Sequence, residues 1–169
     1  RQACSDRGPY GDDRGRGGIF QDAHALNMNL GETTITDLCL LTIARAHIPN
    51  IRIASARGRD EPDKGFDWEW FIRYPQSSWL RFSVQAKKLS PTTERYNSLR
   101  HPVGAKYQID LLEAFAKAQG SIPLYAFYNF PPPGHSAKWN CALPSDNEQY
   151  GCTLVPLQDV RAVHEKGQP

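Results

Sequence analysis

The chain has 169 residues, 40% of them hydrophobic, and carries a formal net charge of +2 with an isoelectric point of about 8.4. This length predicts one domain with a sizeable core. A charge this small does not by itself indicate a nucleic-acid-binding protein, and no apolar run approaches the ~20 residues that a membrane span needs. The chain shows no secretory signal pattern, so we expect a cytoplasmic protein without membrane contacts.

The first 18 residues are rich in Gly, Arg and Asp and contain little apolar sequence. This composition predicts a flexible arm over residues 1–18, followed by a single domain over residues 19–169. The four cysteines lack the CxxC spacing of a structural zinc site, so no zinc is expected.

The first half of the domain predicts one helix followed by three strands. Residues 32–47 have the pattern of an amphipathic helix, and the residues expected on its buried face are Ile35, Leu38, Leu41 and Ala44. Strands are predicted over residues 51–54, 67–73 and 79–88, with a Pro/Ser turn joining the last two.

The second half begins with a long basic loop over residues 90–105, whose length favours a functional role. A helix over residues 106–119 and a strand over 124–130 follow, and the nearly continuous apolar run of that strand predicts helices on both faces of the sheet. An edge strand (151–156) and a terminal helix (157–164) complete the order. The core therefore reads αβββαβ, which predicts an α/β fold with a central mixed sheet flanked by helices.

Strand 79–88 alternates between apolar and polar residues. The apolar set, expected in the core, is Leu80, Phe82, Val84 and Ala86; the polar set on the other face is Arg81, Ser83, Gln85 and Lys87. Asp67 begins the preceding strand. A carboxylate, an amide oxygen and an ammonium group that converge at strand ends can hold a divalent cation and a water molecule beside a phosphate.

Asp67 followed by Gln85-Ala86-Lys87 resembles the PD-(D/E)xK nuclease superfamily, and the Gln resembles its Mrr-like branch. The wider string from Leu30 to Asn129, with GETTITD, FDWEW, VQAKKL and PLYAFYN, is similar to a small family within that superfamily. The resemblance implies a restriction-endonuclease-like fold and hydrolysis of phosphodiester bonds with Mg²⁺ or Mn²⁺. It implies DNA as the favoured substrate and prokaryotic genome defence as a setting.

The same resemblance assigns roles to individual residues. Asp67 would be the main metal ligand, joined by the amide oxygen of Gln85, the backbone carbonyl of Ala86 and the first-helix carboxylate of Glu32. Lys87 would orient the attacking water and offset charge in the transition state. The expected catalytic set is therefore Glu32, Asp67, Gln85 and Lys87.

Two acidic residues are alternatives for the second carboxylate. Glu32 has a competing interpretation as an acid that stabilises a helix N-terminus, and Glu61 is then the next candidate. Glu69 shares the face of Asp67 and is expected at the surface. Nucleic-acid contacts are expected from Lys88, Arg95, Arg100, His101, Lys106 and Gln108.

A rival interpretation is a catalytically weak or inactive module of the same fold that binds nucleic acid or a protein partner. The neutral Gln85 and the modest net charge favour it. A third interpretation is a ribonuclease or toxin on the same scaffold, and a homodimer stays open for all three.

Overall fold

The computed structural model describes residue 23 and residues 26–56, 64–74, 78–90, 92–96, 98–129 and 151–165. The expected arm over residues 1–18 and the alternative carboxylate Glu61 lie outside these ranges. No helix in the described ranges is long and apolar enough to span a membrane.

The helices and strands follow the predicted order closely. They are α2 (Glu32–Arg45), β1 (Ile51–Ser55), β2 (Trp68–Arg73), β3 (Trp79–Lys88), β4 (Pro102–Val103), β5 (Lys106–Tyr107), α4 (Gln108–Gln119), β6 (Ile122–Tyr128), β7 (Cys152–Pro156) and α5 (Leu157–Glu165). The small β4–β5 hairpin lies in what was expected to be a loop. Its second strand takes up two residues that were assigned to the following helix, so α4 begins at Gln108.

Five strands form one mixed sheet in the order β1-β2-β3-β6-β7. Strands β1, β2 and β3 are antiparallel neighbours, β3 and β6 are parallel, and β6 and β7 are antiparallel. The parallel pair is joined through α4, as a strand–helix–strand unit requires. The prediction of an α/β fold with a central mixed sheet flanked by helices is confirmed.

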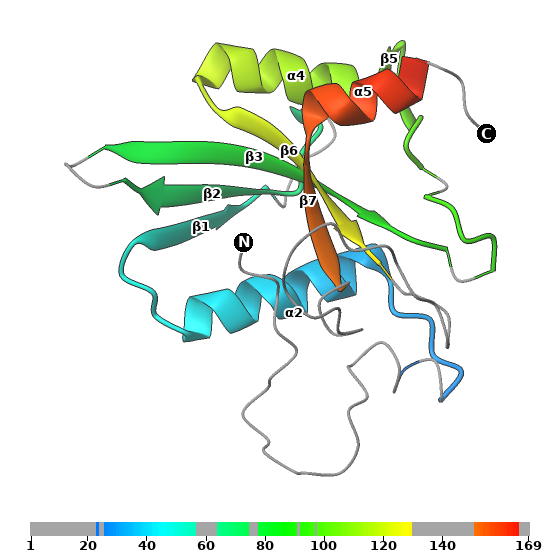
Figure 1. The fold of residues 1–169 in the computed structure, drawn as a ribbon, viewed down its shortest axis with the longest axis horizontal. Helices are drawn as coiled ribbons and strands as arrows, with labels where there is room; N and C mark the ends of the chain where they lie inside the picture. The colour runs from blue at the N-terminus through cyan, green and yellow to red at the C-terminus, as the bar shows by residue number, and fades with distance from the viewer. Residues whose placement is uncertain are drawn as a thin grey trace, which may run out of the picture.

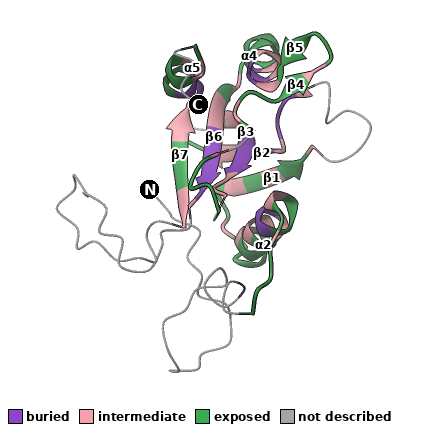
Figure 2. Ribbon diagram, turned by 90° about the vertical axis from the view of Figure 1, so that its right-hand side faces the viewer, coloured by how far each residue is buried: buried purple, intermediate pink, exposed green. Residues whose placement is uncertain are grey.

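The sheet is covered on both faces (Figure 1). Helix α2 lies on one side, over a core cluster that includes Trp68, Val84 and Ala126. Helices α4 and α5 lie on the other, over a cluster that includes Tyr125 and Leu112. Figure 2 views the layers from the side, with the buried residues concentrated along the central strands. The candidate site residues of β3 therefore lie between two covered faces.

The alternation in β3 was only partly a guide to burial. Val84 and Ala86 are fully buried as predicted, but Leu80 is 39% exposed and Phe82 is partly buried. The prediction for Leu80 was wrong because the hairpin end of β2 and β3 projects beyond the helices (Figure 1). On the opposite face, Ser83, Gln85 and Lys87 are buried as well, because α4 and α5 cover that side.

The buried face of α2 also differs from the prediction. Ile35 is buried, yet Leu38 and Leu41 are 39% and 48% exposed. A helix has 3.6 residues per turn, so positions spaced by three drift around its axis. The residues that face the sheet after Ile35 are instead Cys39 and Leu40, which pack against the core cluster of Trp68 and Val84.

Candidate functional site

The site is built where β3 continues past the start of β2. Val84 is the last residue of β3 opposite a residue of β2, and its carbonyl accepts a hydrogen bond from Asp67 N at 2.9 Å. Backbone groups two residues apart in a strand point to the same side. The N–H groups of Ala86 and Lys88 therefore face the same edge as Val84, beyond the end of the partner strand.

Two carboxylates replace the missing partner strand at this edge. Asp67 Oδ2 accepts a hydrogen bond from Ala86 N at 2.6 Å, and Glu32 Oε2 accepts one from Lys88 N at 2.9 Å. The backbone of Asp67 is fixed on both sides, because its carbonyl also accepts a hydrogen bond from Ala56 N. The two acids thus bind the backbone of β3 at the residues directly before and after Lys87.

Gln85 joins the Asp67 carboxylate to the backbone of β3. Its side chain is 1% exposed, and its Nε2 donates to Asp67 Oδ2 at 2.6 Å and to the Ala86 carbonyl at 3.0 Å. Gln85 Oε1 is buried and has no hydrogen-bond partner. Buried amide oxygens are nearly always paired in proteins, so this atom marks a place where the fold leaves a polar group unsatisfied.

Lys87 lies beside both acids and is only 5% exposed. Its Nζ donates to Gln108 Oε1 at 2.8 Å, which connects β3 to the first turn of α4. Burial lowers the pKa of the Lys87 ammonium below its usual value, and the negative charges of Glu32 and Asp67 oppose that shift. The structure therefore brings Gln108, a residue expected to contact nucleic acid, against Lys87.

Glu32 is held in the first turn of α2. The hydroxyl of Thr36 donates to the Glu32 carbonyl at 3.0 Å and also hydrogen-bonds Tyr128 Oη at 3.0 Å, which ties this turn to β6. Burial raises the pKa of the Glu32 carboxyl, while Lys87, the hydrogen bond from Lys88 N, the Lys88 charge and His101 oppose the shift. The charges of Glu32 and Asp67 thus act on the same lysine, Lys87.

Gly65 sets the approach to Asp67, a role that the sequence did not reveal. It has a φ of +71°, and a Cβ added there would lie 2.6 Å from the Gln108 carbonyl oxygen and 2.7 Å from Leu112 N. Only glycine allows both the left-handed backbone and this close approach to α4. The contact places the segment that carries Asp67 against the helix that carries Gln108.

The donor set fits a hard divalent cation. Among the residues that the structure describes, no three His, Cys, Asp or Glu side chains are grouped as metal ligands, so the candidate set depends on neutral oxygens. The Gln85 amide end lies 2.6 Å from Asp67 Oδ2 and 3.0 Å from the Ala86 oxygen. Adjacent ligands around Mg²⁺ are separated by roughly 3 Å, since each bond is about 2.0–2.1 Å long.

The basic residues expected to contact nucleic acid differ in whether they hydrogen-bond to the protein itself. Lys88 Nζ donates to Asn29 Oδ1 at 2.7 Å and to the Leu30 carbonyl, and the guanidinium of Arg100 donates to the His164 carbonyl. Arg95, His101 and Lys106 are exposed. Lys88 and Arg100 therefore hydrogen-bond to the protein itself, although Arg100 is exposed like the other three.

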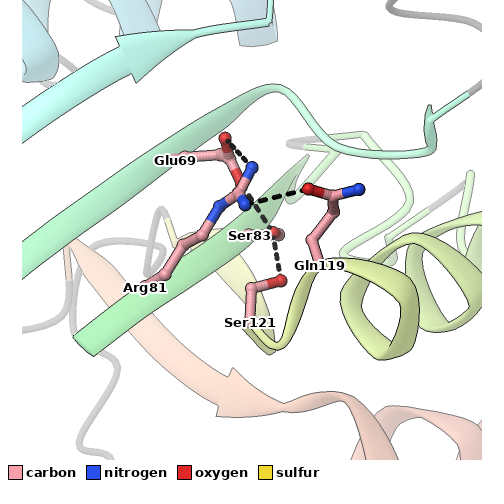
Figure 3. Close-up of polar contacts among 5 residues, drawn as sticks. All are labelled: Glu69, Arg81, Ser83, Gln119 and Ser121. Carbon is pink, nitrogen blue, oxygen red and sulfur yellow. Dashed lines mark hydrogen bonds and ion pairs between the residues drawn. The ribbon is translucent and has the colours of Figure 1, made fainter. Parts of the chain in front are cut away.

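Glu69 is not at the surface, so that prediction was wrong. It is 7% exposed and accepts hydrogen bonds from Arg81 Nε at 2.8 Å, Arg81 Nη2 at 2.9 Å and Ser83 Oγ at 3.0 Å. Ser83 also hydrogen-bonds Ser121, and Arg81 Nη1 donates to Gln119 (Figure 3). We call these five residues the closed cluster. Because Arg81 neutralises Glu69, this acid is not a candidate metal ligand.

The molecule is thus an α/β protein with a central mixed sheet and a cluster of acidic, amide and basic groups at the uncovered edge of β3. The chain belongs to a family of unknown function, DUF6615, whose model matches residues 19–168. The match includes every candidate site residue named above. No curated protein sequence matches the chain.

Proposed function

We propose that the protein is a metal-dependent nuclease that hydrolyses phosphodiester bonds, with DNA as the favoured substrate. The observation that carries the proposal is a buried lysine, Lys87, set between two carboxylates that hold the backbone of the same strand. Burying a charge is costly, and the charges of Glu32 and Asp67 offset that cost only in part, because the net shift of the Lys87 pKa is downward. Such groups collect where chemistry is done.

Each residue of the site has a defined task in this proposal. Asp67, Gln85, the Ala86 carbonyl and Glu32 would hold Mg²⁺ or Mn²⁺, which supplies Lewis-acid polarisation of a phosphoryl oxygen when bound. Lys87, positioned by Gln108, orients the attacking water and faces the charge that grows on the phosphoryl oxygens. The exposed Arg95, His101 and Lys106 contact the nucleic-acid backbone. Genome defence in a prokaryotic cytoplasm is the setting that the family resemblance adds.

The test is cleavage of supercoiled plasmid and of single-stranded RNA in Mg²⁺, Mn²⁺ or EDTA. We expect DNA cleavage that needs the cation and falls about 10²-fold or more in Lys87→Ala and in Asp67→Asn. Matched controls are Lys117→Ala on α4 and Asp159→Asn on α5, both exposed and outside the site, which should retain full activity. Cleavage by Lys87→Ala at the wild-type rate would reject the mechanism.

The second candidate is a module that keeps the fold and binds nucleic acid or a protein without cleaving. It is favoured by Gln85 Nε2, which occupies Asp67 with a hydrogen bond and brings no negative charge of its own. Folded protein that retards DNA in a gel but cleaves neither DNA nor RNA would select this function. Cleavage of RNA alone would select the ribonuclease.

A further inference from the structure

The side-chain amide of Gln85 lies in a position that permits two orientations. The side chain is 1% exposed and its Nε2 lies between an anionic oxygen of Asp67 and the Ala86 carbonyl oxygen, while Oε1 has no partner. The register partner of Gln85 on β6 is Tyr125, whose hydroxyl is also buried without a hydrogen-bond partner. Two buried polar atoms that have no hydrogen-bond partner therefore belong to side chains of register partners on neighbouring strands.

The chemistry of the two neighbours determines which end of the amide faces them. Both neighbours are acceptors, so only the NH₂ end can be satisfied there when no cation is present. The reversed amide would place its oxygen against the carboxylate of Asp67 at 2.6 Å. That contact is repulsive, and leaving Oε1 unpaired on the other side is the less costly alternative.

A bound cation reverses this preference. With a positive charge between them, Asp67 Oδ2, the Ala86 carbonyl oxygen and an inward Oε1 would be three ligand oxygens. The amide end lies 2.6 Å and 3.0 Å from the other two, near the roughly 3 Å that separates adjacent ligands of Mg²⁺. The NH₂ group would then occupy the place that Oε1 holds now. The two ends of the amide have nearly the same size, so a buried side chain can exchange them by rotating its last bond without repacking the core.

We infer that Gln85 is a cation-dependent ligand of this site. Its amide points its nitrogen at Asp67 in the cation-free protein and its oxygen at the cation in the bound protein. The inference depends on the metal site of the proposed function. Cation binding must break the two hydrogen bonds of Gln85 Nε2, so a cation binds only if its bonds to the site oxygens offset that loss.

The experiment follows the side-chain NH₂ signals of glutamine by ¹H–¹⁵N NMR in wild-type protein, with Mg²⁺ alone as the probe. The Gln85 signal is assigned by its absence in Gln85→Glu. In EDTA we expect Gln85 NH₂ protons that exchange slowly with water, because both are hydrogen-bonded. Addition of Mg²⁺ should shift this pair and speed its exchange, while the pair of Gln119 in the closed cluster stays unchanged.

A second variant measures the same effect through affinity and stability. Gln85→Glu places a second carboxylate beside Asp67, so it should lower Tm in EDTA and bind Mg²⁺ at least about tenfold more tightly by calorimetry. If calorimetry detects Mg²⁺ binding to the wild-type protein while the Gln85 NH₂ signal stays unchanged, the inference is overturned and the metal site stands. Absence of Mg²⁺ binding to folded wild-type protein would overturn both.

Discussion

Two polar clusters include neighbouring side chains on one face of β3, and they are built in opposite ways. In the closed cluster, Arg81 donates two hydrogen bonds to Glu69 and a third to Gln119 (Figure 3). At the other end of β3, Lys87 hydrogen-bonds the neutral Gln108, and the carboxylates of Asp67 and Glu32 bind backbone N–H groups. We call this second group the open cluster.

The two clusters differ in whether their buried polar and charged groups are all paired. Charges in the closed cluster are matched within it, as buried ion pairs require. The open cluster keeps an unpaired amide oxygen on Gln85 and a lysine whose pKa is lowered by burial. Such unmatched groups cost stability, and proteins keep them where a ligand completes the set. Similar residues therefore form a structural cluster where their charges are matched and a candidate site where some polar groups are left unmatched.

The largest expected loss of stability comes from a substitution at Gly65, whose backbone supports the open cluster. Gly65→Ala should lower the free energy of unfolding by about 3–5 kcal/mol, because the new Cβ meets the α4 backbone and the residue has a left-handed φ. Urea denaturation measures the loss. Gly120→Ala is the control, since its φ is +63° and its Cβ would meet no atom within 4 Å, and it should cost only about 1–2 kcal/mol. Equal losses would refute the steric argument.

Arg81→Met tests the closed cluster. Removing the guanidinium leaves the buried Glu69 carboxylate with Ser83 but without its cation. We expect a loss of about 2–4 kcal/mol, somewhat less than for a fully buried pair because the Arg81 side chain is 27% exposed. Thermal and urea denaturation give the measurement. Wild-type stability in this variant would show that the ion pair contributes nothing to the fold.

Lys87→Met is the matched substitution in the open cluster. Methionine keeps the length and the apolar stem of lysine. The substitution removes a charge that burial disfavours, and it also removes the cation that acts on Glu32 and Asp67. Because these two effects oppose each other, the stability should change by less than about 1.5 kcal/mol. Under the proposed function the same variant loses cleavage. A loss as large as that of Arg81→Met would mean that Lys87 is structural and that the two clusters do not differ.

The smallest expected effect is a dependence of stability on pH through Glu32. Its folded pKa is raised above 4.5, so between 4.5 and that raised value the folded state keeps a proton that the unfolded state has lost. Stability contributed by Glu32 therefore falls as pH rises through this window. Urea denaturation in EDTA should show wild type losing stability relative to Glu32→Gln, whereas Glu165→Gln, exposed on α5, should follow wild type. Parallel profiles for wild type and Glu32→Gln would contradict the shift.

The sequence was a good guide wherever periodicity reflects burial. The apolar run of β6 and the alternation of β3 predicted two neighbouring strands, and the positions of Asp67 and Gln85 at strand ends predicted that they meet, which a hydrogen bond of 2.6 Å confirms. Their proposed role in catalysis stays a prediction. Local patterns suffice for these features because side chains alternate within one strand.

Features that depend on distant segments were missed. Glu69 reads as a surface acid because its partners Arg81 and Ser83 are on the next strand and Ser121 follows α4. Gly65 reads as an ordinary loop glycine because the atoms it approaches belong to α4. Neither contact leaves a periodic signal in the sequence. The contacts of Glu69 are set by the β2–β3 register, in which Glu69 lies opposite Ser83, and that of Gly65 by how α4 docks on the sheet.

The stagger between β2 and β3 determines which backbone groups of β3 are left for the candidate site. Because β2 begins at Trp68, opposite Val84, no strand in the described part of the chain pairs with the β3 backbone from Ala86 to Lys88 on that side. A redesigned chain in which β2 began a few residues earlier would fill this edge with ladder hydrogen bonds and displace both carboxylates. The same fold would then be a more regular scaffold without the two carboxylate contacts to β3, so the length of β2 determines whether the candidate site can form.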